Sequence, residues 1–184
     1  MFIRSERLFL RPAWPEDLEE TFALVNDRAV VRNLVSAPWP YTIEDAREFL
    51  ARPREAMLPN FFVTLPSAEG ARLIGHVGLA RDQDDVELGY WIAPAYWGQG
   101  YATEAARAVL NLARVLGHRR VVAGHFTDNP ASGRVLEKVG FVPTGARRIR
   151  YSAGRGGVAP ALAYAIELGE ACNCDDEVDA MHAA

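Results

Sequence analysis

Two closely spaced glycines, Gly98 and Gly100, are the residues of this chain best suited to binding an anion. Glycine lets the backbone turn sharply and brings its N–H groups close to a ligand. The helix expected to begin near Tyr101 adds the positive end of its dipole. Residues 97–103 are therefore predicted to hold a phosphate or a pyrophosphate.

The residues around these glycines distinguish between the known classes of phosphate-binding turn. A P-loop needs Lys and then Ser or Thr directly after its last glycine, whereas Tyr101 and Ala102 follow Gly100. A P-loop is therefore excluded. A dinucleotide-binding fold needs three glycines in the pattern Gly-x-Gly-x-x-Gly, and the third position here is Thr103. That fold stays open as an alternative.

The segment from Trp97 to Ala102 resembles a third pattern, Gln/Arg-x-x-Gly-x-Gly/Ala before a helix. This is the acyl-CoA pyrophosphate loop of the GNAT family of N-acetyltransferases. Residues 87–92 are similar to the strand that takes the pantetheine arm in that family, and residues 129–141 to its later helix and Gly-Phe ending. The resemblance covers most of residues 4–168 and is strongest to the branch that acetylates ribosomal-protein N-termini. Trp97 departs from it, since the family usually has Gln or Arg there.

The resemblance implies an α/β fold with a mixed, mostly antiparallel central sheet, helices on both faces and a splayed V between the two central strands. It also implies acetyl-CoA as co-substrate and direct transfer of acetyl to a primary amine without a covalent enzyme intermediate. No metal is expected, because the four histidines lack metal-ligand spacing and the two cysteines supply only two of the usual four zinc ligands. A backbone N–H near Trp91 or Ile92 would stabilise the oxyanion. The residues expected to bind the cofactor are Trp91, Ile92, Trp97, Gly98, Gln99, Gly100, Tyr101, Ala102, Thr103 and Asn129.

Two residues are candidates for proton transfer. Glu87 stands on the pantetheine strand and is the candidate base, with a solvated strand carboxylate as the alternative. Many family members have a tyrosine before the Glu-Lys of the later helix to protonate the thiolate, but Leu136 occupies that position. Ser132 matches the position proposed as the acid in the ribosomal N-terminal branch; its alternative role is an ordinary hydroxyl in the first turn of a helix.

The acceptor is less sharply defined. Trp39, Tyr41 and Tyr90 are candidates to line its pocket, with buried packing as the alternative for each. A protein N-terminal α-amine is the leading acceptor, followed by aminoglycosides, amino acids and polyamines. Leu136 and Trp97 also motivate a non-catalytic acyl-CoA-binding sensor. A late arginine cluster is expected to contact the CoA 3'-phosphate, an acidic acceptor or RNA, or else only solvent: Arg147, Arg148, Arg150 and Arg155.

Composition and charge limit the domain organisation, the partners and the location of the chain. The 184 residues are 49% hydrophobic and suit one domain, residues 1–169, followed by an acidic, flexible tail, residues 170–184, that holds Cys172 and Cys174. A net charge of -4 argues against a nucleic-acid partner and weakly favours a cationic acceptor. Without an apolar run near eighteen residues or a signal segment, we expect no membrane partner and a cytoplasmic location. A monomer and a homodimer are both compatible with the sequence.

Hydrophobic periodicity predicts the elements that position these residues. A three-strand antiparallel meander is expected before the glycine loop, and strands and a short helix after it. The expected strands are 7–11, 60–65, 72–80, 86–92, 120–126, 141–142, 147–151 and 161–168. The expected helices are 16–27, 42–52, 101–116 and 130–138.

Overall fold

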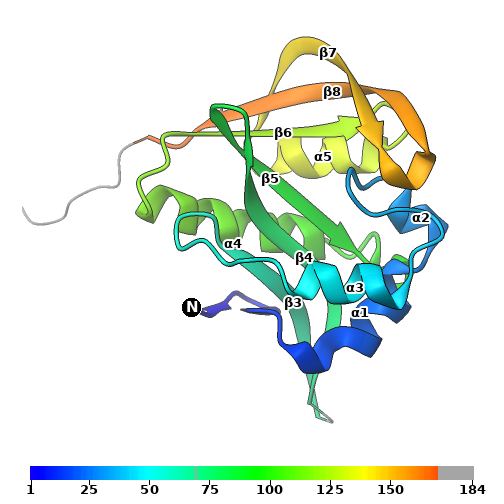
Figure 1. Cartoon of the computed structure of the whole chain (residues 1–184). Coiled ribbons are helices and arrows are strands. Elements are labelled where there is room, and N and C mark those ends of the chain that lie inside the picture. The colour runs from blue at the N-terminus through cyan, green and yellow to red at the C-terminus, as the bar shows by residue number, and fades with distance from the viewer. Residues whose placement is uncertain (69, 170–184) are drawn as a thin grey trace, which may run out of the picture.

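The computed structural model describes residues 1–68 and 70–169, and within them the chain forms one eight-stranded sheet in the order β1-β2-β3-β4-β5-β6-β8-β7 (Figure 1). The strands are β1 (Ile3–Arg4), β2 (Phe9–Arg11), β3 (Asn60–Ser67), β4 (Gly70–Asp82), β5 (Asp85–Ile92), β6 (Arg120–Phe126), β7 (Val142–Ser152) and β8 (Gly157–Glu167). The α-helices are α1 (Leu18–Val25), α2 (Arg28–Val31), α3 (Ile43–Leu50), α4 (Tyr101–Val115) and α5 (Pro130–Lys138), and the short 3₁₀ turns are η1 (Pro15–Asp17), η2 (Pro94–Tyr96) and η3 (Ala153–Arg155).

All pairings in this sheet are antiparallel except the one between β5 and β6. Parallel neighbours need a crossover, and α4 supplies it between these two strands. The predicted meander is present as β3, β4 and β5. Because a dinucleotide-binding fold has a mostly parallel sheet, this arrangement removes that alternative and confirms the mixed, mostly antiparallel fold.

Helices cover both faces of the sheet (Figure 1). Helix α4 presents a continuous apolar stripe to β4 and β5, with Ala105, Ala106, Val109, Leu110 and Ala113 buried. Helix α5 packs beside it on β6. On the opposite face, α1, α2 and α3 enclose a smaller core around Trp91. Successive side chains of β5 therefore enter different cores.

Strands β5 and β6 diverge almost as soon as they meet. The only residue pair between them is Glu87 with Val122, although β5 continues to Ile92 and β6 to Phe126. The other neighbouring long strands pair over most of their length. The expected V between these strands is thus present, with Glu87 at its closed end.

Some predicted boundaries were wrong. The helix expected over residues 16–27 begins with η1 and ends at Val25, because the Asp27 side chain accepts the Ala29 N–H and starts the separate helix α2. Two strands expected near the C-terminal end are one strand, β7, whose pairing with β8 shifts between Pro143 and Arg147. The predicted tail, with Cys172 and Cys174, lies outside the described residues. No described helix is long and apolar enough to cross a membrane.

Candidate active site

The open end of the V exposes backbone groups of β5. Ala93 donates its N–H to Ile74 O at 2.8 Å, and hydrogen-bonded pairs alternate along an antiparallel ladder. The Tyr90 and Ile92 N–H groups therefore point away from β4, toward the gap beside β6, whereas the Trp91 N–H points toward β4. Of the two residues expected to supply an oxyanion donor, Trp91 and Ile92, only Ile92 has an N–H that points into this gap.

The glycine loop follows immediately and presents further donors. Gly98 and Gly100 have φ values of 75° and 83°, in the left-handed region that side chains rarely adopt. Gly100 is the N-cap of α4, and the first helical N–H to find a backbone partner is that of Glu104, which bonds Gly100 O at 3.0 Å. Within the described part of the chain, the N–H groups of residues 98–103 donate to no other group. This concentration of donors at a helix N-terminus suits an anion.

Arg7, which precedes β2, holds this loop in place. Its Nη1 donates to Gln99 O at 3.0 Å, and its guanidinium lies 4.7 Å from the centre of the Tyr101 ring. Its Nε and backbone N–H both bond Glu104, which Ser5 Oγ also reaches at 2.7 Å. Burial raises the pKa of Glu104, but these hydrogen bonds outweigh burial and lower the pKa overall. Glu104 is therefore the carboxylate that anchors Arg7.

Trp97, which departs from the family pattern, occupies a position that the sequence did not predict. Its Nε1 donates to Ile92 O at 2.6 Å, and this carbonyl faces the gap beside β6. The indole is nevertheless half exposed and lines the cavity described below. Trp97 thus links the glycine loop to the end of β5, in place of the longer polar side chain that the resemblance leads one to expect.

Glu87 has a strong partner, Arg150 of β7. Arg150 Nη2 donates to Glu87 Oε2 at 2.6 Å, and Arg150 Nη1 donates to the other carboxylate oxygen. The hydrogen bond with Glu87 is the main cause that raises the pKa of Arg150. Both oxygens of Glu87 therefore accept from Arg150, and this fixes the carboxylate between β5 and β7.

Ser132 in α5 lies beside Tyr90 of β5. Their hydroxyl oxygens are 2.8 Å apart, and Tyr90 Oη also donates to Ser132 O at 3.1 Å. Burial is the largest cause that raises the pKa of Tyr90 to about 12, so this phenol stays protonated near neutral pH. Asn129 Oδ1 accepts the Ser132 N–H and caps the helix. The Tyr90–Ser132 pair is the only hydroxyl pair that β5 and α5 bring together in the described residues.

The three predicted acceptor-lining residues do not form one group. Tyr41 is 6% exposed and packs with Trp91 against α1–α3, and burial raises its pKa to about 12. Tyr90 packs on the other face, against the larger core. Trp39 is 40% exposed in the loop before α3. The structure thus separates Tyr90 from Tyr41 by the sheet.

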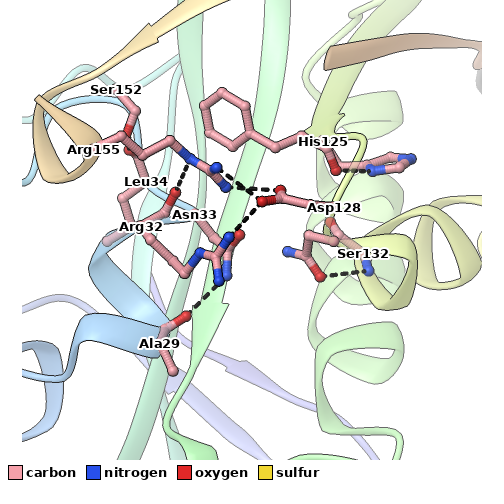
Figure 2. A network of polar contacts seen from close by, with 11 residues as sticks. Ala29, Arg32, Asn33, Leu34, His125, Asp128, Ser132, Ser152 and Arg155 are labelled. Carbon is pink, nitrogen blue, oxygen red and sulfur yellow. Dashed lines mark hydrogen bonds and ion pairs between the residues drawn. The ribbon is translucent and has the colours of Figure 1, made fainter. Parts of the chain in front are cut away.

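A cavity of about 760 Å³ lies where the glycine loop, α2, η3 and the loop after β6 meet. Figure 2 shows the ion pairs that cross this region from α2 to the start of α5. Asp128 accepts from Arg155 Nη1 at 2.9 Å and Nη2 at 2.8 Å, and also from Arg32. The hydrogen bond from Arg155 is the largest cause that lowers the pKa of Asp128. The cavity is lined by Arg28, Ala29, Arg32, Asn33, Trp97, Asp128, Asn129, Gly154 and Arg155.

The structural roles of several arginines in this region could not be predicted from local sequence patterns. Arg7 and Arg150 contact residues more than sixty positions away, and a long-range ion pair leaves no spacing pattern. Arg155 was noticed only as part of a basic hairpin. Among residues 1–68 and 70–169, no group of three or more His, Cys, Asp or Glu side chains is placed to hold a metal ion.

Comparison with known proteins agrees with this geometry. A family model described as an acetyltransferase (GNAT) domain matches residues 7–142. The chain is 31% identical to the uncharacterized N-acetyltransferase YoaA of Bacillus subtilis, over 79% of this chain and 85% of that protein. A GNAT-family acetyltransferase from Bacillus anthracis superposes with a TM-score of 0.77 at 29% identity, over 91% and 99% of the two chains. A ribosomal L7/L12 α-N-protein acetyltransferase solved with coenzyme A shares the fold, with a TM-score of 0.74 at 19% identity over 91% and 98%.

Proposed function

This chain belongs to the GNAT family of acetyltransferases, and from that premise we propose that it transfers the acetyl group of acetyl-CoA to the α-amine of a protein N-terminus. The family assignment makes it an acetyl-CoA-dependent N-acetyltransferase. The identity of the acceptor is the part that we propose. A binding protein without catalysis is disfavoured, because the matched relatives are named as acetyltransferases.

The glycine loop supports a site for the pyrophosphate of acetyl-CoA. Its N–H groups from residue 98 to residue 103 donate to no other described group, and the dipole of α4 adds to their attraction for an anion. The pantetheine arm would then enter the gap between β5 and β6, where the free N–H groups of β5 are placed to pair with it. This places the thioester near Ile92, whose N–H is our proposed oxyanion donor.

The reaction forms one C–N bond and breaks one C–S bond. The neutral amine attacks the thioester carbon and gives a tetrahedral oxyanion, and the amine proton passes to the proposed base, Glu87, directly or through water, as the intermediate collapses. The electron pair of the C–S bond leaves with sulfur, and the CoA thiolate takes up a proton. We propose that Ser132 delivers this proton, and that the Tyr90 phenol then turns its single O–H from Ser132 O to Ser132 Oγ.

The Glu87–Arg150 ion pair is the observation that favours an α-amine. A carboxylate held at both oxygens by a guanidinium is less free to move toward an incoming amine, so an amine that deprotonates easily is preferred. At pH 7, deprotonation costs about 1 kcal/mol for an α-amine, compared with about 4.6 kcal/mol for a lysine amine. An N-terminal acceptor thus needs the least help from Glu87.

The acceptor assignment predicts a specific pattern of activity. We expect CoA release at pH 7.5 with peptides that have a free N-terminus and no release with the same peptides when the N-terminus is formylated. Free lysine, spermidine and an aminoglycoside serve as competing acceptors in the same assay. Release with these compounds, and none with any peptide, would replace the N-terminal acceptor by a small-molecule amine.

Glu87 remains the predicted base, and a pair of variants tests it. If Glu87 accepts the amine proton, Glu87→Gln lowers kcat by about a hundredfold. Arg150→Gln removes the same ion pair but keeps the carboxylate, so it should retain activity. Equal losses in both variants would mean that the pair supports β5 and β7 and that Glu87 takes no proton.

A further inference from the structure

The cavity beside the V has a charge opposite to that of the whole chain. The chain carries a net charge of -4. The cavity lining contains three arginines, Arg28, Arg32 and Arg155, and one acidic residue, Asp128, which gives a formal charge of three minus one, or +2. Local charge, and not the net charge, acts on a ligand within such a cleft.

Asp128 neutralises only part of this charge, because Arg32 and Arg155 share it. Arg155 is also fixed in position: its Nε donates to Arg32 O at 2.7 Å, and its guanidinium lies 4.4 Å from the centre of the Phe126 ring. The hydrogen bonds drawn in Figure 2 hold the orientation of the Arg155 guanidinium. Such a fixed cation loses little side-chain entropy when it binds an anion.

Arg28 is the remaining cation. It is exposed at the start of α2 and lines the cavity. In the part of the chain that the structure describes, it has no hydrogen-bond or ion-pair partner through its side chain. Its guanidinium is thus free to bind an anionic ligand in the cavity.

The position of these arginines separates them from the cofactor loop. They come from α2 and η3, whereas the donors for the pyrophosphate come from residues 98–103 and Arg7 supports that loop. Only Trp97 and Asn129 connect the cavity to the cofactor side. Given the cofactor path that we propose, the arginines lie outside it and are left for the acceptor.

We infer that the acceptor is an N-terminal segment with acidic side chains, Asp or Glu, in its first few residues, held by Arg28, Arg32 and Arg155. This inference rests on the proposed function and narrows its substrate. The positive lining also disfavours polyamines and aminoglycosides, because these acceptors carry several positive charges. Net charge alone had weakly favoured the opposite class of acceptor.

Three hexapeptides that differ only at positions two and three test the charge preference: Ser-Glu-Asp, Ser-Gln-Asn and Ser-Lys-Lys, each with the same neutral remainder. One accessible ion pair changes an affinity by about two- to fivefold. We therefore expect kcat/KM for the acidic peptide to exceed that of the neutral peptide by roughly tenfold, with the basic peptide lowest. Raising the salt concentration to 0.5 M should shrink these ratios, since salt screens exposed charges.

Arg28→Glu tests the site itself, with Arg4→Glu as the matched control. Arg4 is exposed on the edge strand β1, so the control makes the same change in net charge away from the cavity. We expect Arg28→Glu to abolish the preference for the acidic peptide, with KM for acetyl-CoA and the melting temperature unchanged, and Arg4→Glu to keep the preference.

The outcomes distinguish this inference from the proposed function. Equal rates for the three peptides would overturn the acidic preference and leave N-terminal acetylation intact. A raised KM for acetyl-CoA in Arg28→Glu would assign the arginine to the cofactor and overturn the inference. Activity with spermidine, and none with any of the peptides, would overturn both proposals.

Discussion

Replacing Gly100 by valine is expected to raise the Kd for acetyl-CoA by about thirty- to a hundredfold. Gly100 has a φ of 83°, and a β-branched residue strongly avoids that region. The backbone would relax and turn the N–H groups at the start of α4 away from the pyrophosphate. Each hydrogen bond to a charged group contributes about 1.5–3 kcal/mol, and a loss of about 2.1–2.8 kcal/mol corresponds to this change in Kd. Calorimetric titration with acetyl-CoA measures it.

Gly117→Val is the control for the strain that this substitution introduces. Gly117 has a φ of 84°, has open space where its Cβ would lie, and follows the other end of α4. Both variants should lose about 1–2 kcal/mol of stability from a left-handed side-chain residue, but only Gly100→Val should lose affinity. If both variants bound acetyl-CoA as the unchanged protein does, the glycine loop would not be the pyrophosphate site.

Local patterns predicted the framework of this loop. Two glycines before an amphipathic segment, and a glycine after it, defined α4 at residues 101–116, and the structure has Tyr101–Val115. The information lies within a few residues, because backbone conformation and helical periodicity are local properties. The same holds for the helix expected over residues 42–52, which is present as α3 and begins at a capping box formed by Thr42 and Asp45.

The charged partners were not predictable in this way. Arg7 with Glu104, and Arg150 with Glu87, meet only after the sheet has formed. The place of Glu104 in the first turn of α4 indicates by itself only a residue that complements the helix dipole. Its hydrogen bonds with Arg7 add a structural role that requires knowledge of where β2 lies.

The charge of the cavity could not be predicted from the sequence for a related reason. Net charge sums over the whole surface, whereas the cavity draws on segments near residues 28–32, 128 and 155. Gly154 shows how closely two of these segments pack, because a Cβ there would lie 2.5 Å from Val31 O. The sequence reveals each arginine but not that they face one cavity.

Removing the Ser132 hydroxyl is expected to lower kcat by about a hundredfold, with KM for acetyl-CoA nearly unchanged. A proton donor to the thiolate acts in the transition state and adds little to binding of the thioester, so kcat carries the loss. Ser132→Thr keeps a hydroxyl and should recover part of the activity. Steady-state kinetics of Ser132→Ala and Ser132→Thr measure both expectations.

Tyr90→Phe shows whether the two hydroxyls work as a unit. It should lower kcat by about tenfold, since Ser132 keeps its own proton but loses the phenol 2.8 Å away. If Tyr90 acts only through Ser132, the double variant will be no slower than Ser132→Ala alone, because coupled residues are not additive. Multiplied losses would instead mean that Tyr90 contributes separately, for example by packing α5 on β5.

The pH dependence of kcat gives a further test. Because burial raises the pKa of Tyr90 to about 12, ionisation of this phenol should not limit kcat at pH 7–9. A fall in kcat across that range would contradict its role as donor.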